Sequence, residues 1–378
     1  MEKSPKRLYE LSLEVMILGY FRSRILNMMK TSQIKFFLIT VVLLSTSRLW
    51  AWGGRGHDTI CEVAVHLVED PSLKNFLQGR GYMMGHLCNI PDTQWRQLDA
   101  KAKAAGDPTH FIDPEIVGAI PKTLSLDLAS LIKEHSQKPN QFEKGKKIFS
   151  VPREVGTSWW RVDQFMREIA ALKEKFQTAK PPQSKQEEQN DEHPFNQAAH
   201  RFITMAGVMG HFVGDASQPL HSTADYDGYA QGHGGLHGYY ETAVVNTFDG
   251  DLQTQVLKEA RKIKKAPWLQ GSTLEKMRTF SQVAFEDLPQ VWKLDPVLKK
   301  SERKEEKGMS LRTPAERKPP EEAAKKYKPL IIKQMARSAK LLANLWDEAY
   351  KNAGKPNLNT YKSYKYPHTV DFLYPDYE

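Results

Sequence analysis

Residues 211–221 read His-Phe-Val-Gly-Asp-Ala-Ser-Gln-Pro-Leu-His, and the chemistry predicted for this chain starts from them. Residues four apart on a helix share one face, so His211 and Asp215 can offer a nitrogen and a carboxylate oxygen to one divalent ion. Pro219 ends the helix, which lets His221 turn back toward that face. This stretch therefore predicts the end of a helix that carries metal ligands.

Three glycines, Gly207, Gly210 and Gly214, fall along the same predicted helix. Each glycine lowers helix propensity, because the unfolded chain has more backbone freedom to lose. Their presence predicts a packing or site constraint that brings neighbouring groups unusually close to this helix.

A second pair with the same spacing, His237 and Glu241, follows the glycine-rich segment 232–235. A histidine and a carboxylate four residues apart are more often an exposed ion pair than metal ligands, so neither pair is decisive alone. Two pairs so close in the chain favour a metal site. Upstream, His57 and His110 are further candidates, although each alone could be a surface histidine.

The rest of the chain predicts an all-α protein, because apolar residues recur at spacings of three and four. We expect one multi-helix domain over residues 52–354, interrupted by charged, solvated and mobile insertions at about 178–195 and 299–326. Residues 355–378 form a tail without clear periodicity, which we expect to pack on the surface. The predicted helices cover residues 59–69, 121–134, 157–176, 196–216, 238–260, 273–290 and 326–352.

The N-terminal segment 1–51 resembles an export signal preceded by an over-extended start. Lys30 and Lys35 come before the apolar run 36–44, which is too short to span a bilayer, and cleavage after Ala51 would leave Trp52 first. We therefore expect a secreted or periplasmic protein. The segment holds eight Lys/Arg and three Asp/Glu, so its removal lowers the net charge from +9 to +4. So mild a charge neither requires nor excludes an anionic substrate.

The two cysteines of the chain, Cys61 and Cys88, cannot form a disulfide framework, although one bridge is possible in an oxidising compartment. Cys61 lies in the apolar run 60–65. A small buried hydrophobic residue is the favoured interpretation there.

Three motifs together resemble a known family. They are Trp-Gly-x-x-Gly-His at 52–57, His-Phe-Ile-Asp at 110–113 and His-Phe-x-Gly-Asp-x-x-Gln-Pro-Leu-His at 211–221. They are similar to the zinc-dependent single-strand nucleases of the S-one/P-one type, which share a fold with bacterial zinc phospholipase C. Residues 336–346 are also similar to the family's last helix. The motifs stand in the family's order over most of residues 52–352.

The resemblance implies a centre of three zinc ions. Asp92, His110, His211 and Asp215 would hold the first ion, and Asp215 would bridge to a second. His57 and the amino group and carbonyl oxygen of Trp52 would complete the second site. The third ion would be held by His221, His237 and Glu241.

The resemblance also implies a reaction and a substrate. The expected activity is hydrolysis of phosphodiester bonds in single-stranded DNA or RNA, and of 3′-nucleotides, by a metal-activated water that Asp92 orients. Phe111 would stack on a base and Asp113 would hydrogen-bond its edge, although Phe111 could equally be a core aromatic. Arg96 is a candidate phosphate contact. No obligate protein partner is indicated.

The sequence departs from the nucleases in three ways. Glu241 replaces their usual aspartate, and the short spacing from His221 to His237 is closer to phospholipase C. The chain between His110 and His211 is longer than in either branch. Arg96 is displaced by one position from the basic residue expected after Asp92. A phospholipase C acting on phospholipids is therefore the alternative, and a noncatalytic zinc-binding scaffold is the third hypothesis.

Overall fold

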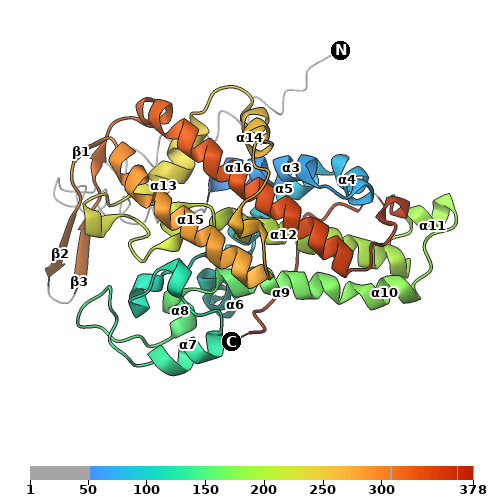
Figure 1. Cartoon of the computed structure of the whole chain (residues 1–378), viewed down its shortest axis with the longest axis horizontal. Helices are drawn as coiled ribbons and strands as arrows, with labels where there is room; N and C mark the ends of the chain where they lie inside the picture. The colour runs from blue at the N-terminus through green and yellow to red at the C-terminus, as the bar shows by residue number, and fades with distance from the viewer. Residues whose placement is uncertain (1–51, 307–308, 364, 378) are drawn as a thin grey trace, which may run out of the picture. The chain divides into compact units, whose positions relative to one another are not determined.

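The computed structural model describes residues 52–306, 309–363 and 365–377, without the side chains of residues 305–309. The prediction of a mostly helical protein is confirmed (Figure 1). The predicted export signal and its cleavage point before Trp52 lie at the edge of, or outside, the described residues. None of the described helices is both long and apolar enough to cross a membrane.

The helices follow one another with short turns and 3-10 segments between them. Their bounds are α3 Gly53–Leu67, α4 Pro71–Gln78, α5 Gly81–Thr93, α6 Ala100–Gly106, α7 Leu128–His135, α8 Val151–Val155, α9 Ser158–Ala170, α10 Leu172–Thr178, α11 Lys185–Gln189, α12 Pro194–Asp215, α13 Leu236–Gly238, a π-helical turn Tyr239–Val244, α14 Leu252–Ala260, α15 Thr273–Leu294 and α16 Pro320–Asn352.

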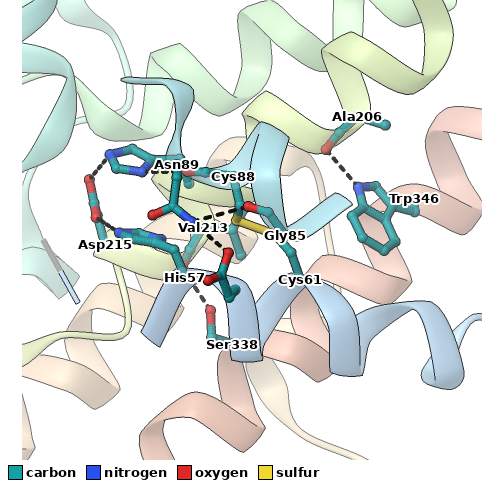
Figure 2. Close-up of a disulfide and its surroundings, with 12 residues drawn as sticks. His57, Cys61, Gly85, Cys88, Asn89, Ala206, Val213, Asp215, Ser338 and Trp346 are labelled. Atoms are coloured by element: carbon teal, nitrogen blue, oxygen red, sulfur yellow. Dashed lines mark hydrogen bonds and ion pairs between the residues drawn. A yellow bond between two sulfur atoms is a disulfide. The ribbon is translucent and has the colours of Figure 1, made fainter. Parts of the chain in front are cut away.

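Helix α12 is buried along most of its length and lies among α3, α5, α9 and α16. Pro194 supplies the fixed φ suited to a first helical turn, and His193 before it accepts a hydrogen bond from the amide of Phe195. Two side chains of α16 hold the long last helix against it: Ser338 donates to the carbonyl of Val213 and Trp346 donates to that of Ala206 (Figure 2). These bonds satisfy buried polar groups at the helix contact.

The three glycines of α12 mark its closest contacts, as the sequence predicted. A methyl group at Gly207 would clash with Leu87, and one at Gly210 would clash with the sulfur of Cys61. At Gly214 a Cβ atom would lie 2.8 Å from Nδ1 of His57. The loss of helix propensity is therefore offset by close packing of α12 against α3 and α5.

The sequence missed three helices between residues 71 and 106. Helix α4 has a clear N-terminal signal, because Asp70 accepts hydrogen bonds from the amides of Ser72 and Leu73. Helix α5 contains Gly85 and Pro91, and it is buried on more than one side. The sequence of α5 therefore lacks the regular apolar spacing that marks a helix with one buried face. Conversely, the helix predicted from residue 121 begins only at Leu128, and the helix predicted over 238–260 is interrupted between residues 245 and 251.

The second charged insertion differs from the irregular, mobile segment that we expected. It holds strands β1 Val297–Lys299, β2 Glu302–Glu306, β3 Met309–Thr313 and β4 Glu316–Arg317. Strands β2 and β3 form an antiparallel hairpin, and β1 pairs with β4. Figure 1 shows these strands beside α13. Their short length and charged composition hid the alternation that normally marks a strand.

The C-terminal tail follows the surface of the helices. The indole of Trp95 donates to the carbonyl of Val370, at 2.8 Å, and its ring packs edge-on against Phe372. Arg167 on α9 forms two hydrogen bonds with the carboxylate of Asp376. These contacts join the tail to α9 and to the segment after α5.

Candidate metal centre

Eight predicted ligands meet in the interior although they come from distant parts of the chain. They form three groups in which the possible ligand atoms lie within 4.8 Å of one another. All eight side chains are buried, none being more than 6% exposed. The groups are His57, His211 and Asp215; Asp92, His110 and His211; and His221, His237 and Glu241.

Asp215 connects the first two groups through its two carboxylate oxygens. Oδ1 lies 3.3 Å from Nε2 of His57, whereas Oδ2 lies 3.0 Å from Nδ1 of His110 and 3.3 Å from Nε2 of His211. One oxygen thus faces each group. This is the arrangement that a carboxylate bridging two metal ions needs.

The third group is built on the π-helical turn Tyr239–Val244 and the turn after α12. Nε2 of His237 lies 3.0 Å from Oε2 of Glu241, and Nε2 of His221 lies 3.8 Å from the same oxygen. Gln218 also donates to this oxygen, at 3.0 Å. Single π turns inside helices occur frequently at functional sites.

Backbone carbonyls orient three of the imidazoles. Nδ1 of His211 lies 2.8 Å from the carbonyl oxygen of Cys88, and Nδ1 of His221 lies 2.8 Å from that of His110. Nδ1 of His237 lies 3.0 Å from the carbonyl oxygen of Tyr226. A carbonyl can only accept, so Nδ1 carries the proton and Nε2 keeps its lone pair for a metal.

Burial dominates the electrostatics of the centre. It raises the pKa of Asp92 and of Asp215, and it lowers the pKa of His110 and of His211 well below the ordinary value. The two histidines therefore stay neutral, as metal ligands must be. In the third group, burial by itself would lower the pKa of His237 and raise that of Glu241. The two residues instead stabilise each other's charged forms, which outweighs burial. As a result, the pKa of Glu241 falls and that of His237 rises.

The donor atoms fit divalent metal ions. Among the described residues, Oδ2 of Asp92, Oε1 of Glu241 and Nε2 of His221 are buried without a hydrogen-bond partner. Leaving such groups unsatisfied is costly unless another ligand occupies them. Neutral imidazoles and carboxylates in sets of three are the donors that zinc prefers. The residues present therefore match a metal centre.

A disulfide between Cys61 and Cys88 lies directly behind the ligands (Figure 2). The sequence favoured a small buried hydrophobic residue at Cys61 and left one bridge possible. Cys61 is fully buried, and it also forms the bridge, because the fold brings the two Cα atoms to 6.5 Å. Cys61 lies one turn after His57 on α3, and Cys88 lies one turn before Asp92 on α5. The bridge joins the two helices next to His57 and Asp92, two of the candidate metal ligands.

Trp52 is fully buried at the start of α3, and its indole donates to the carbonyl of Gly214 and to the hydroxyl of Ser217. Its backbone nitrogen lies 3.2 Å from Oε2 of Glu241. The nitrogen was expected to bind the second ion with His57 and Asp215, but here it contacts Glu241 of the third group. Its carbonyl oxygen accepts a hydrogen bond from the amide of Gly56.

The three predicted substrate contacts border the centre. Phe111 is half-buried, and Asp113 is buried with a carboxylate oxygen that lacks a hydrogen-bond partner among the described residues. Burial, aided by Glu115, raises the pKa of Asp113 well above its ordinary value. Arg96 lies one helical turn beyond Asp92, and its Nε is 2.7 Å from Oδ1 of that carboxylate. A phosphate contact by Arg96 remains a prediction.

Sequence reasoning missed several residues that support the ligands. Gln218 stood inside the quoted motif, and its spacing from Glu241 gave no sign of their contact. Glu115 accepts hydrogen bonds from the hydroxyl of Thr223 and the amide of Ala224, just after His221. Asp227 accepts from the amide of His237. Only the fold reveals these contacts.

No model of a known protein family matches this chain, and no curated protein matches its sequence. The class of protein is therefore defined by the fold and the site alone. It is a mostly helical protein with three buried groups of His, Asp and Glu residues that could hold metal ions.

Proposed function

We propose that this protein is an exported zinc-dependent phosphodiesterase with the nuclease and phospholipase C type of helical fold, acting mainly on single-stranded nucleic acid. One observation carries the proposal: the two oxygens of Asp215 face separate histidine groups. With the third group nearby, this arrangement supports a centre of three ions. An isolated structural zinc needs a single closed set of four ligands instead.

Each of the three proposed ions would have its own set of ligands. Asp92, His110, His211 and Asp215 would hold one ion, and Trp52, His57 and Asp215 a second. The third would be held by His221, His237 and Glu241. When bound, zinc activates a water as a nucleophile near neutral pH and neutralises charge on the phosphate.

Residues of the chain prepare the site for hydrolysis. Arg96 pairs with Oδ1 of Asp92, which also lies 3.8 Å from Nε2 of His211, and the buried Oδ2 has no hydrogen-bond partner among the described residues. This carboxylate would orient the attacking water and accept its proton. The disulfide and the carbonyl of Cys88 hold this carboxylate and His211 in place. The site is therefore organised before substrate binds.

Phe111 and Asp113 support the nuclease over other phosphodiesterases. A half-buried aromatic ring offers a face on which an unpaired base can stack. Burial raises the pKa of Asp113, which favours the protonated carboxyl, a form that can both donate and accept hydrogen bonds at a base edge. A stacked duplex cannot present such a base.

Phospholipase C is the second candidate, because Glu241 and the short spacing from His221 to His237 are closer to that branch. A phospholipid also carries a phosphodiester, and a phospholipase C hydrolyses its ester bond to the glycerol. The same metal centre would serve either substrate.

The amino group of Trp52 requires proteolytic maturation. In the uncut chain Trp52 has a φ of 37°, in the left-handed region that residues with a side chain seldom occupy. Cleavage after Ala51 removes the peptide bond that defines this angle and converts an amide into a free amine. Such an amine has a pKa of about 7.7–8.0 and loses its proton to a metal at neutral pH.

The decisive experiment assays the mature protein, loaded with zinc, against single-stranded DNA, RNA and phosphatidylcholine in parallel. Faster turnover of either nucleic acid supports the nuclease. Exclusive cleavage of phosphatidylcholine would replace it with the phospholipase. Stoichiometric zinc without turnover of any of the three would instead support a noncatalytic scaffold.

A further inference from the structure

The hairpin β2–β3 is attached to the loop that leads into the third ligand group. The amide of Ser301 donates to the carbonyl of Gly232, and its hydroxyl accepts from the amide of Gly234. The amide of Ala315, beyond the other end of the hairpin, donates to the carbonyl of Gly234. Both ends of the hairpin are thus fastened a few residues before His237.

Arg312 on β3 points to the side of the hairpin that faces this loop. Its guanidinium carbon lies 5.3 Å from the centre of the Tyr229 ring, within the range of a cation–π contact. It also lies beside Tyr226. Burial raises the pKa of Tyr226, and Arg312 opposes the rise through its charge and a side-chain hydrogen bond.

Tyr226 connects Arg312 to the metal centre. Its carbonyl oxygen accepts a hydrogen bond from Nδ1 of His237, and its ring lies edge-on to that imidazole with centroids 5.7 Å apart. Tyr226 is also close enough to Asp113 for the negative charge of that carboxylate to raise the tyrosine's pKa. The half-buried ring of Tyr226 therefore lies between His237 and the exposed guanidinium of Arg312, and the half-buried ring of Tyr229 lies beside the same guanidinium.

The two neighbouring arginines, Arg303 and Arg317, contact carboxylates, unlike Arg312. Arg317 is bound to the buried carboxylate of Asp295, and Arg303 lies 3.4 Å from Glu143. Arg312 is exposed and forms no ion pair with the side chains that the structure describes. Its charge is therefore available to an anion arriving at the centre.

We propose that Arg312 is a specificity-determining residue that binds a phosphate next to the one being cleaved, with Tyr226 and Tyr229 supporting the adjoining nucleotide. This inference rests on the proposed nuclease function. A guanidinium binds phosphate oxygens through two parallel hydrogen bonds, and tyrosine rings stack on bases of any sequence. The hairpin thus makes the enzyme prefer chains with more than one phosphate.

The charge of Arg312 favours a polynucleotide over a phospholipid. A strand of nucleic acid carries a phosphate at every nucleotide, so a second phosphate always accompanies the one at the metals. Phosphatidylcholine has a single phosphate and a cationic head group, which a guanidinium repels. An exposed arginine placed beside two tyrosines therefore fits nucleic acid better.

The test compares Arg312→Gln with the wild-type holoenzyme on two substrates, a dinucleoside monophosphate and a tetranucleotide. We expect the variant to raise KM for the tetranucleotide at least about threefold and to reduce the dependence of log(kcat/KM) on log[salt] by about 0.7–1. The dinucleoside monophosphate, which lacks a second phosphate, should be cleaved with unchanged kcat/KM. Arg312→Lys should retain part of the preference.

Lys304→Ala is the matched control, because Lys304 lies on the opposite face of the same hairpin: it follows Arg303, which pairs directly with Arg312. It should leave both substrates unaffected. Equal effects of Arg312→Gln and Lys304→Ala, or equal effects on the two substrates, would overturn the role of Arg312. Wild-type protein that cleaves neither substrate would instead overturn the nuclease proposal itself.

Discussion

The carbonyl oxygen of Cys88 lies 2.8 Å from Nδ1 of His211, and the same cysteine is bonded to Cys61. A covalent bridge and the orientation of a metal ligand therefore depend on one residue. His57 and Asp92 lie one helical turn from the two half-cystines. The disulfide should influence the metal centre as well as the stability of the fold.

We expect the double variant Cys61→Ala and Cys88→Ala to lose stability and to bind zinc more weakly. A disulfide that joins cysteines at a sequence separation of 27 stabilises a fold by about 3–4 kcal/mol in the chain-entropy model. Denaturant unfolding measures the first effect, and competition with a zinc chelator measures the second. Lower stability with unchanged zinc affinity would show that the disulfide stabilises the fold without influencing the metal centre.

Mature protein should contain about three zinc ions, and the stabilisation that they provide should grow as pH rises. Burial raises the pKa of Asp92 and of Asp215, so the folded protein without metal keeps protons that the unfolded chain has lost. Its stability therefore falls as pH increases from 3.8, the ordinary pKa of an aspartate, to about 7, the pKa of these carboxyls in the folded protein. Zinc binds the deprotonated carboxylates and removes this cost.

Metal analysis and melting curves check this expectation. The difference in Tm between zinc-loaded and chelator-treated protein should be larger at the higher pH, and chelation should abolish activity. Fully active protein with one zinc ion or none would contradict the three-ion centre. A Tm difference independent of pH would show that the buried carboxyls do not exchange protons for metal.

Asp215→Asn should lose metal and activity far more than His200→Asn. The first substitution replaces the carboxylate that faces two ligand groups by a neutral amide. The second replaces a half-buried histidine on the same helix, which contacts the hydroxyl of Tyr361. Zinc content and phosphodiesterase rate distinguish the two variants. Similar mild losses from both would mean that α12 acts only as a packing element.

An extra residue before Trp52 should reduce zinc occupancy at one position. An amide nitrogen cannot replace an amine as a ligand, because its lone pair is delocalised into the peptide bond. Protease treatment that leaves Trp52 first should restore both the zinc and the activity. Full zinc content and full activity before the cut would exclude the amino group as a ligand and leave the remaining sites standing.

The helical class and two pairs of candidate ligands could be predicted from local spacing, whereas Asp92 was proposed only from the family resemblance. His211 and Asp215, like His237 and Glu241, lie four residues apart, and that distance along a helix places both side chains on one face whatever surrounds them. The glycines of α12 likewise predicted that neighbouring groups pack closely against this helix. These conclusions needed no knowledge of which elements become neighbours.

The elements with weak local signals could not be predicted. Helix α5 is buried on more than one side and contains Gly85 and Pro91, so it has no narrow apolar stripe. Strands β2 and β3 are too short and too charged to show alternation. The hairpin is held to the loop before His237 by bonds to distant residues. Arg312 consequently looked like part of a solvated insertion.

By itself the sequence determined a mostly helical chain and the residues able to bind metal, because helix periodicity and ligand chemistry are properties of residues near one another. The tertiary structure alone decided that Cys61 meets Cys88, that Asp215 faces two groups and that Arg312 lies beside Tyr226. Each of these contacts joins segments far apart in the chain. Such pairs form only through the packing of the whole core, which no local pattern of residues encodes.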